Sequence, residues 1–321
     1  MLSIAGVRVD PPLVLAPMEG VTDVSFRQLV RKVGGAGLVY TEFVPARGLS
    51  QNLRAARELV SFDEDERPIA LQVYGRDPAT LAEGARVAEA LGADIVDLNM
   101  GCPSKKVCAH SGGSALLQDL GLATQIVRAM RAALRGPFTV KMRSGWDPSH
   151  RNALEVARMC EGEGVDAVTV HWRTRADGYA GTRDVSTIAA IKGALSIPVI
   201  ANGDVVDAAS GAAMLADTGA DGLMVGRGAI RNPWVFHELG HALYGRAAVS
   251  PDKAERARVL FAYFDDIRAR FGSDRAALGR WKKIAKYFTE GLDDGTLRTS
   301  FLRATSVEEA REIAERFFAT P

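Results

Sequence analysis

The chain alternates between short apolar runs and longer amphipathic segments along residues 13–227. Eight apolar runs are rich in aliphatic and β-branched residues, and we predict them as strands: residues 13–18, 37–43, 69–74, 94–99, 138–143, 167–172, 198–203 and 222–227. Two of the segments between them, residues 78–93 and 121–134, repeat apolar residues three and four positions apart. That spacing is typical of a helix with one buried face.

Strands that are near-continuously apolar and alternate with helices indicate a parallel sheet covered by helices. Eight such units predict an α/β fold of the (β/α)8 TIM-barrel type. A doubly wound open sheet is the alternative. It is disfavoured because the first predicted strand ends in APMEGVTD and not in a glycine-rich dinucleotide-binding loop.

The pattern changes near residue 243, and two domains are predicted. Residues 1–243 form the barrel, residues 244–250 read as a linker, and residues 251–321 form a small all-helical domain. The apolar positions of the last part recur at helical spacing, which supports its all-helical assignment.

Capping patterns predict where these C-terminal helices begin. Ser250 is expected as an N-cap with Pro251 at the first helical position. A second helix is predicted over residues 275–292. A third is expected to begin at Ser306, where Ser-Val-Glu-Glu forms a capping box with Glu309.

Composition restricts the setting in which this fold works. A hydrophobic content of 47% and a charged content of 25% are typical of a globular protein with a packed core. The net charge of +1 means that any basic surface for nucleic acid must be local. The N-terminus does not resemble a signal peptide, and no apolar run reaches membrane-spanning length. We therefore expect a cytoplasmic protein that does not bind membranes.

The chain has three cysteines, Cys102, Cys108 and Cys160. Their small, odd number argues against a disulfide framework. The spacing of the first two, with no further Cys or His nearby, is a poor zinc pattern, and we expect no metal. Cys102, in the stretch NMGCPSKK, remains a candidate nucleophile, a candidate acid or a small buried residue.

Polar and charged residues gather at the predicted carboxyl ends of the strands, where TIM barrels carry their active sites. In chain order they are Pro17, Met18, Gln72, Asn99, Cys102, Lys141, Arg143, His171, Arg173, Arg175, Asn202, Gly203, Asp204, Gly226, Arg227 and Gly228. The residues at the ends of the last two predicted strands predict a phosphate site. Small residues there allow the backbone to approach a ligand, and Arg227 supplies charge.

Gln72, Lys141 and His171 are predicted to converge above the mouth of the barrel. A lysine in that position is costly to bury unless it is paired or useful. The three side chains suit hydrogen bonding to a flat heteroaromatic ring. The lysine would stabilise negative charge such as that of a reduced flavin.

Seven segments together resemble one family. They are APMEGVTDVSFRQLVRKVGGAGLVYTEFV, ALQVYGRDP, DLNMGCPSKKV, VKMRSGW, VHWRTRADGYAG, VIANGDV and GLMVGRGAIRNPWVF. In this order they are similar to the tRNA-dihydrouridine synthases, most closely the bacterial B-like type. The resemblance implies an FMN-binding barrel, a helical tRNA-binding domain, and reduction of the C5=C6 bond of uridines in tRNA. It alone implies NADPH (or NADH) as the reductant.

The resemblance also implies roles for individual residues. Cys102 would be the proton donor, and Asn99 would lie beside the target base. The residues expected to bind FMN are Ala16, Pro17, Met18, Gln72, Lys141, His171, Asn202, Gly203, Asp204, Gly226 and Arg227.

A basic stretch in the helical domain predicts RNA binding. Residues 268–286 contain seven basic side chains and one acidic side chain. Phosphate contacts of this kind supply affinity and no sequence readout. The residues expected to contact substrate or RNA, besides Asn99, are Lys105, Lys106, Arg143, Arg173, Arg175, Arg280 and Lys283. Lys105 and Lys106 are assigned to phosphate because a cation that stabilised the thiolate would defeat an acid.

Other functions compete with this interpretation. The chain could be an FMN-dependent barrel that acts on a free pyrimidine or related small molecule, although the basic helical domain argues against it. It could also be a flavin-free isomerase or lyase with a phosphorylated substrate, or an RNA-binding relative without catalysis. We expect tRNA as the partner and a monomer as the working form.

Overall fold

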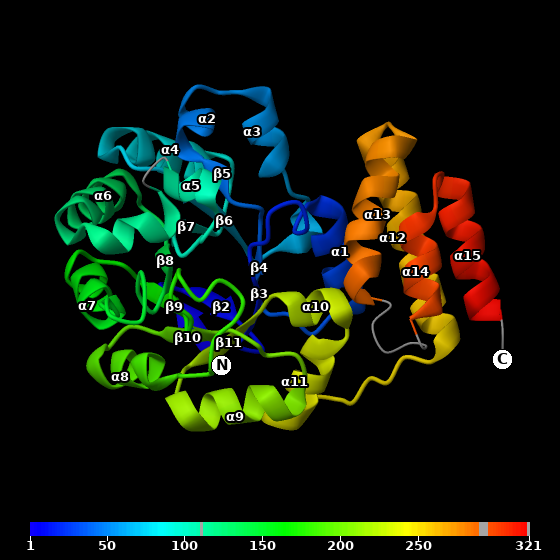
Figure 1. The fold of residues 1–321 in the computed structure, drawn as a ribbon. Coiled ribbons are helices and arrows are strands. Elements are labelled where there is room, and N and C mark those ends of the chain that lie inside the picture. The colour runs from blue at the N-terminus through cyan, green and yellow to red at the C-terminus, as the bar shows by residue number, and fades with distance from the viewer. Residues whose placement is uncertain (110–111, 289–294, 320–321) are drawn as a thin grey trace.

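The structure, a computed structural model, describes residues 1–109, 112–288 and 295–319, and it contains a parallel barrel followed by a group of helices (Figure 1). The barrel strands are β3 (Leu13–Leu15), β4 (Val39–Tyr40), β5 (Val44–Pro45), β6 (Ile69–Tyr74), β7 (Ile95–Met100), β8 (Phe138–Arg143), β9 (Ala167–His171), β10 (Val199–Asn202) and β11 (Gly222–Val225). Neighbouring strands follow the order β3-β11-β10-β9-β8-β7-β6-β4, and β5 pairs with β6.

The two ends of this strand order meet. Val14 in β3 forms a parallel bridge with Leu38, just before β4. The amide of Leu15 donates to the carbonyl of Leu38 at 2.9 Å, and the amide of Gly37 donates to the carbonyl of Leu13 at 2.8 Å. The sheet is therefore closed, so the predicted (β/α)8 TIM barrel is confirmed and the open sheet is wrong.

Helices cover the outside of the barrel. They are α1 (Val24–Val33), α2 (Ala46–Ser50), α3 (Arg54–Leu59), α4 (Pro78–Ala90), α5 (Lys105–Ala109), α6 (Leu120–Ala133), α7 (Ala153–Gly162), α8 (Ser186–Ala194), α9 (Ala208–Thr218), α10 (Arg227–Arg231) and α11 (Val235–Tyr244), with short 3-10 turns at Glu64–Glu66 and Gly113–Gln118. The two predicted amphipathic segments form α4 and α6. The helix α4 buries Leu81, Ala85 and Ala88 against the strands.

The barrel interior is filled in layers, because alternate side chains along each strand point inward. The lowest layer is apolar and includes Val14, Ile95, Ile200 and Met224. A hairpin of β1 (Leu2–Ile4) and β2 (Val7–Val9) closes this end of the barrel. Its strands have three residues each, too few for the pattern to have predicted them. The upper layers are polar and face the opposite end, so the barrel is open to chemistry at one end only.

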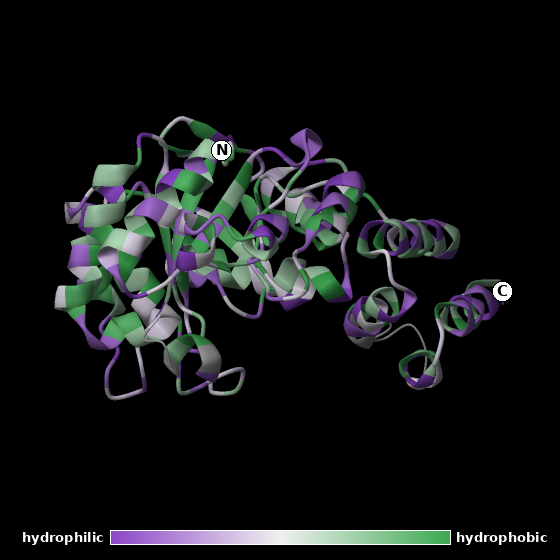
Figure 2. Ribbon diagram, turned by 90° about the horizontal axis from the view of Figure 1, so that it is seen from above, coloured by the Kyte–Doolittle hydropathy of each residue, from purple (hydrophilic) through white to green (hydrophobic). Residues whose placement is uncertain are grey.

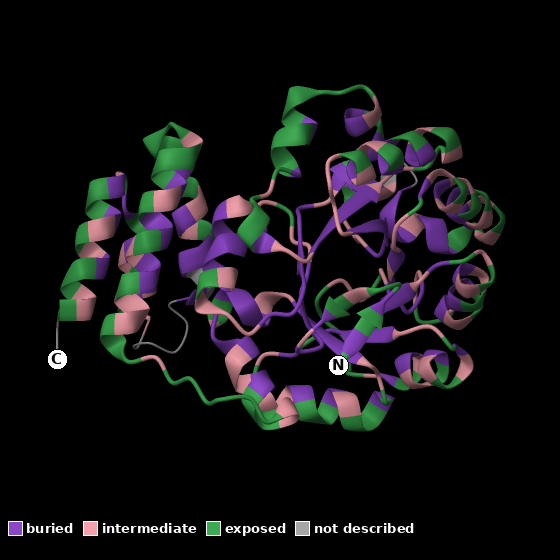
Figure 3. Cartoon of the chain, turned by 180° about the vertical axis from the view of Figure 1, so that it is seen from behind, coloured by how far each residue is buried: buried purple, intermediate pink, exposed green. Residues whose placement is uncertain are grey.

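The remaining helices are α12 (Lys253–Phe271), α13 (Asp274–Phe288), α14 (Thr296–Arg303) and α15 (Val307–Ala319). Seen from above in Figure 2, they lie to one side of the barrel. α12 packs on α1 and α13 packs on α10. The edge contact of Phe26 with Tyr263, at 6.3 Å between ring centroids, joins the two parts. Figure 3 shows the buried strands of the barrel and buried faces on these helices.

The predicted start of α12 is wrong by two residues. Asp252 is the N-cap, and its carboxylate accepts a hydrogen bond from the amide of Glu255 at 2.7 Å. Ser250 and Pro251 precede the helix because the Asp side chain reaches the free amide of the first turn. The next predicted helix corresponds to α13, and its predicted end at residue 292 lies outside the described residues.

The predicted start of the last helix is correct. The hydroxyl of Ser306 accepts from the amide of Glu309 at 3.1 Å, as the capping box requires. The Glu309 carboxylate reaches back to the amide of Thr305 at 2.6 Å, and backbone hydrogen bonds from Thr305 and Ser306 lower its pKa. The helix α14 was not predicted.

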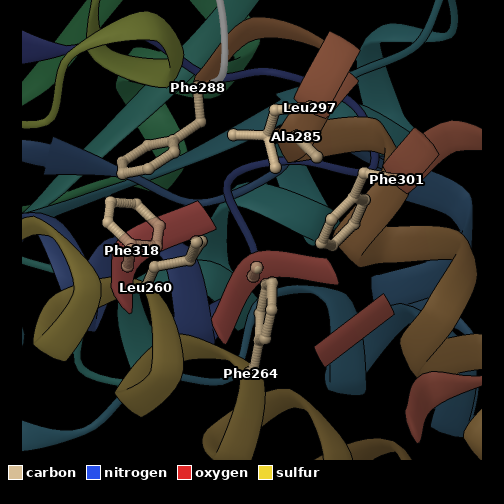
Figure 4. A pocket seen from close by; sticks show the side chains of 8 residues that line it. Leu260, Phe264, Ala285, Phe288, Leu297, Phe301 and Phe318 are labelled. Carbon is tan, nitrogen blue, oxygen red and sulfur yellow. The ribbon is translucent and has the colours of Figure 1, made fainter. Parts of the chain in front are cut away.

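Aromatic side chains of the C-terminal helices pack on one another within the apolar core that these helices share with the barrel. Phe264 stacks on Trp281 with 3.8 Å between ring centroids. Figure 4 shows a small gap beside Phe264, and the side chains around it are hydrocarbon: Leu260, Phe264, Ala285, Phe288, Leu297, Phe301, Ala314 and Phe318. This lining offers no polar group to a ligand, so the gap belongs to the core.

Candidate active site

Strand register brings the predicted site residues to the carboxyl end of the barrel. The aligned pairs on neighbouring strands are Gln72–Asp97, Asn99–Lys141, Arg143–His171 and His171–Asn202. These residues occupy the inward positions of their strands, above the apolar layer. Side chains that are up to 130 residues apart in sequence therefore surround one opening.

The loops that follow β3 and β11 meet at this opening. A Cβ built on Gly226 would lie 3.6 Å from Sδ of Met18 and 3.7 Å from Cβ of Ala16. Pro17 between them is partly exposed. The residues after β3 and those after β11, which were both predicted to bind FMN, are thus adjacent.

The loop after β10 has a backbone that only glycine fits. Gly203 has a φ of +121°, and a Cβ there would come within 2.5 Å of the ring of Trp172. Asp204 follows and forms ion pairs with Arg173 at 2.7 Å and with Arg227 at 2.9 Å. One carboxylate between two guanidinium groups leaves a net positive charge, which suits an anionic ligand.

Two basic side chains in the upper layer have lowered pKa values. Burial, assisted by the charge of Arg143, lowers the pKa of Lys141 to about 8. Burial and nearby cations lower the pKa of His171 well below its ordinary value, so its ring is neutral at pH 7. Nδ1 of His171 accepts a hydrogen bond from the amide of Arg173 at 3.1 Å. Its proton is therefore on Nε2, which makes that atom a donor.

Cys102 lies in a loop that is fixed on both sides. Its amide donates to Oδ1 of Asn99 at 2.9 Å, and its carbonyl accepts from the hydroxyl of Ser114 at 2.7 Å. The thiol is partly buried, and this burial raises its pKa above the ordinary value of a cysteine. The thiol is therefore protonated at neutral pH. That state suits an acid better than a nucleophile, which would have to be a thiolate.

All three cysteines are free thiols in the structure. Cys160 is fully buried in the core. Sγ of Cys108 lies 3.5 Å from the carbonyl of Cys102, where it packs against the same loop.

Asp97 was not singled out from the sequence, although it is central to the site. It is fully buried, and its two carboxylate oxygens accept from Nε2 of Gln72 and from the hydroxyl of Thr139, each at 2.6 Å. Burial raises its pKa to about 7. Side chains alternate between the two faces of a strand, so residue 97 shares the inward face with Asn99, two residues later. This alternation is the sequence signal that could have identified Asp97.

The arginines predicted to contact RNA from the barrel hold the protein's own loops. Arg143 is buried, with Nε donating to the carbonyl of Gly101 at 3.0 Å and Nη1 to that of Thr174 at 2.7 Å. Arg173 lies 4.0 Å above the Trp172 ring, and Arg175 lies 4.5 Å above a second Trp ring. Their assignment to RNA stays a prediction.

Two predicted RNA contacts on α13 instead touch the barrel. Arg280 forms an ion pair with Asp23 and lies 3.9 Å from the carboxylate of Glu42. Lys283 donates to the carbonyl of Glu19 at 2.7 Å. Both contacts are with loops at the open end of the barrel, so α13 lies beside the candidate site.

The lysines behind Cys102 belong to α5. Lys105 is exposed at its first position. The side chain of Lys106, which was also predicted to contact RNA, lies outside the described part of the structure.

Two further features concern metal binding and membrane-spanning helices. Among residues 1–109, 112–288 and 295–319, no group of three or more His, Cys, Asp or Glu could hold a metal ion. In the same part of the chain, no helix is long and apolar enough to span a membrane.

Comparison with known proteins supports one family. The sequence model described as Dihydrouridine synthase (Dus) matches residues 14–320. A tRNA-dihydrouridine synthase B of Pseudomonas aeruginosa is 39% identical over 319 residues, which is 98% of this chain and 96% of the relative. A protein of the same name from Pseudomonas syringae pv. tomato is 40% identical, with 98% and 95% covered. A probable tRNA-dihydrouridine synthase of Rhodobacter capsulatus is 38% identical, with 95% and 94% covered.

Proposed function

We propose a function for this chain from the premise that it belongs to the dihydrouridine synthase family, a class of flavin-dependent tRNA oxidoreductases. It reduces the C5=C6 bond of specific uridines in tRNA to give dihydrouridine. FMN is the proposed cofactor and NADPH (or NADH) the proposed reductant. With tRNA as substrate, the proposed place of action is the cytoplasm. The observation that carries the proposal is a protonated, partly buried thiol at the mouth of a barrel lined by basic groups.

The residues at the barrel mouth fit an FMN molecule. Lys141 and the neutral His171 present N–H donors toward the opening. Gly203 and Gly226 leave room for the backbone to approach a phosphate, and Arg227 adds positive charge beside it. When bound, FMN supplies the hydride that is added to the uracil ring.

Reduction of uridine also needs a proton at C5, and Cys102 is the proposed donor. The thiol is protonated at neutral pH because burial raises its pKa. Its S–H bond breaks as the C5–H bond forms, and the electron pair of that S–H bond remains on sulfur as a thiolate. The thiolate then recovers a proton from solvent. Asn99 anchors the Cys102 loop through its carbonyl and is proposed to lie beside the base.

A uridine within folded RNA must leave its stack to reach this opening, at a cost of a few kcal/mol. Tyr179 is exposed at 67% and lies 4.8 Å from the guanidinium of Arg227 and 6.0 Å from that of Arg143. Its ring offers a stacking surface for the displaced base or its neighbour. Lys105 and the helices α12–α15 are the proposed contacts for the RNA backbone.

The test is substitution of Cys102 in enzyme purified with its flavin. Cys102→Ala is expected to lower the rate of dihydrouridine formation in tRNA by roughly 100-fold or more, because general acid catalysis typically contributes 10²–10⁴-fold. Cys108→Ser is the matched control and should retain activity, since its thiol faces the loop backbone. If Cys102→Ala reduced tRNA at the wild-type rate, Cys102 would not be the acid.

The alternative substrate is a free pyrimidine, and the same preparation tests it. Purified enzyme is given NADPH with either uridine-containing tRNA or free uridine, and oxidation of NADPH is followed. The proposal expects turnover with tRNA and little with the nucleoside. The reverse result would favour the small-molecule oxidoreductase.

A further inference from the structure

A continuous line of hydrogen bonds runs from Asp97 to the loop that carries Cys102. Oδ2 of Asp97 accepts from Nε2 of Gln72 at 2.6 Å. Oε1 of Gln72 accepts from Nδ2 of Asn99 at 2.7 Å. Oδ1 of Asn99 then accepts from the amides of Cys102 at 2.9 Å and Gly101 at 3.0 Å. We name these three linked side chains, Asp97, Gln72 and Asn99, the relay.

The relay can be oriented in only one way. The amides of Gly101 and Cys102 can only donate, so Asn99 must direct its oxygen to the loop. Its NH₂ group then faces Gln72, which must present oxygen there and NH₂ to residue 97. Residue 97 must therefore be an acceptor. The carboxylate of Asp97 meets this need, and the hydroxyl of Thr139 donates to its other oxygen at 2.6 Å.

Water cannot substitute for any member of the relay. Asp97 and Gln72 are fully buried and Asn99 is 5% exposed. An unpaired polar group in this setting costs about 1–3 kcal/mol, so loss of one acceptor disturbs the partners that follow it. The position of the Cys102 loop is in this way tied to a carboxylate that lies deeper in the barrel.

We propose that Asp97 is a positioning residue for Cys102, which acts through Gln72 and Asn99 to hold the thiol at the distance that proton transfer to the substrate requires. This inference rests on the proposed function, in which Cys102 is the acid. In this proposal, the side-chain amide of Gln72 makes its hydrogen bonds within the relay. A thiol that is displaced by even about 1 Å would transfer its proton much more slowly.

The test compares Asp97→Leu, which removes the acceptor at similar volume, with Asp97→Asn, which can still accept from Gln72 and can donate to Thr139. The first readout is hydrogen exchange of the Gly101 and Cys102 amides, which needs neither RNA nor turnover. Asp97→Leu should speed this exchange roughly tenfold or more, as expected for loss of a buried hydrogen bond. Asp97→Asn should stay within about threefold of wild type.

The second readout is the kinetics of uridine reduction. Asp97→Leu should lower kcat by roughly 10- to 100-fold and change the KM for tRNA much less, because the displaced thiol acts in the chemical step and most of the tRNA is bound elsewhere. Asp97→Asn should recover most of the rate. Thr139→Val is the matched control, since it removes the other hydrogen bond of the same carboxylate but leaves the relay intact. It should leave loop exchange unchanged.

Two results would overturn the inference: equal exchange of the loop amides in Asp97→Leu and Thr139→Val, or a fall in kcat that Asp97→Asn does not recover. If Asp97→Leu does not fold, Gln72→Met breaks the relay one step later, and unchanged exchange in that variant would equally overturn it. Failure of the wild-type enzyme to reduce uridine would refute the proposed function. Amide exchange would still decide whether Asp97 holds the loop.

Discussion

At the scale of single residues, the site contains groups whose burial costs stability. Lys141 sits in the upper layer of the barrel with the positive charge of Arg143 nearby, and its pKa is lowered to about 8 from an ordinary 10.5. Asp97 shows the opposite displacement, since burial raises its pKa to about 7. Groups displaced in this manner beside an opening are typical of functional sites. The protein tolerates them because the rest of the barrel is well packed.

Lys141→Met should therefore make the protein more stable while it abolishes the proposed function. Below about pH 8 the lysine is charged in both folded and unfolded states, and the full cost of its burial is present. The gain expected at pH 7 is about 1–3 kcal/mol. Between about pH 8 and its ordinary pKa of 10.5 the folded state loses the proton first, so the gain should shrink and then vanish.

Urea unfolding at pH 7 and pH 10.5 measures this difference. Lys192→Met is the control, because Lys192 is paired with Asp221 at 2.8 Å and its removal relieves no burial cost. A Lys141→Met variant less stable than wild type at pH 7 would show that the ammonium is stabilised where it lies.

At the scale of elements, α13 is joined to the open end of the barrel through one guanidinium group. Arg280 pairs with Asp23, which also caps α1 by accepting from the amide of Phe26 at 3.0 Å. Glu42, at 3.9 Å from Arg280, accepts from the amide of Gly20. Arg280 therefore stabilises the loop after β3, which begins with the residues proposed to line FMN. The element predicted to bind RNA also supports the site.

Arg280→Met should destabilise the protein by about 2 kcal/mol at pH 7, because it removes the main cation beside two buried carboxylates. Burial raises the pKa of both Asp23 and Glu42, and removal of the arginine raises them further. The folded variant then binds more protons than the unfolded chain. Its stability should recover as the pH falls from 7 toward 5.

The midpoint of urea unfolding at the two pH values tests this. Arg275→Met, an exposed position on the same helix, should have little effect at either pH. A loss of stability that does not depend on pH would show that Arg280 acts through its packing on Phe271, 4.0 Å away, and not through charge.

At the scale of the whole molecule, the barrel and the C-terminal helices share one apolar core. Residues from α12, α13 and α15 belong to the same buried cluster as those between the barrel strands and their helices. Phe26 and Tyr263 lie at the junction. The two parts should therefore unfold together.

A single unfolding transition is the expected result, and Trp281→Phe makes it measurable. The variant leaves three tryptophans, all in residues 1–243, so fluorescence reports on the barrel while circular dichroism reports on all helices. The two transitions should coincide in urea. A separate, earlier loss of helical signal would mean that the C-terminal helices unfold on their own.

Binding of tRNA should weaken steeply with salt, although several basic residues of the helical part are already paired. Arg268 pairs with Glu308 at 2.9 Å, and Arg270 with Asp63 at 3.1 Å. Lys105 is exposed beside the Cys102 loop. Lys105→Gln should weaken binding and lower the salt slope by about one. Lys32→Gln, at the far end of α1, should not, and an equal effect of both would argue against an RNA contact at Lys105.

The sequence by itself determined the fold and the family. Strand and helix periodicity is local, and β6 and β8 were predicted to the residue because most residues of a buried parallel strand are apolar. The same alternation placed Gln72, Lys141 and His171 at one end of the barrel. Motifs in fixed order then identified the family, since each motif lies on a loop that the barrel brings to that end.

Only the tertiary structure decided which partner each charged or polar side chain has. The basic stretch of α13 looked free in sequence, yet Arg280 and Lys283 meet residues some 260 positions earlier. The role proposed for Asp97 depends on its hydrogen bond with Gln72 on the neighbouring strand and on its burial in the barrel. Hydrogen bonds and pKa values depend on burial and on distant neighbours, and neither is encoded in a local pattern. The pKa of the Cys102 thiol is the clearest case, because burial is the main cause that raises it above the ordinary value.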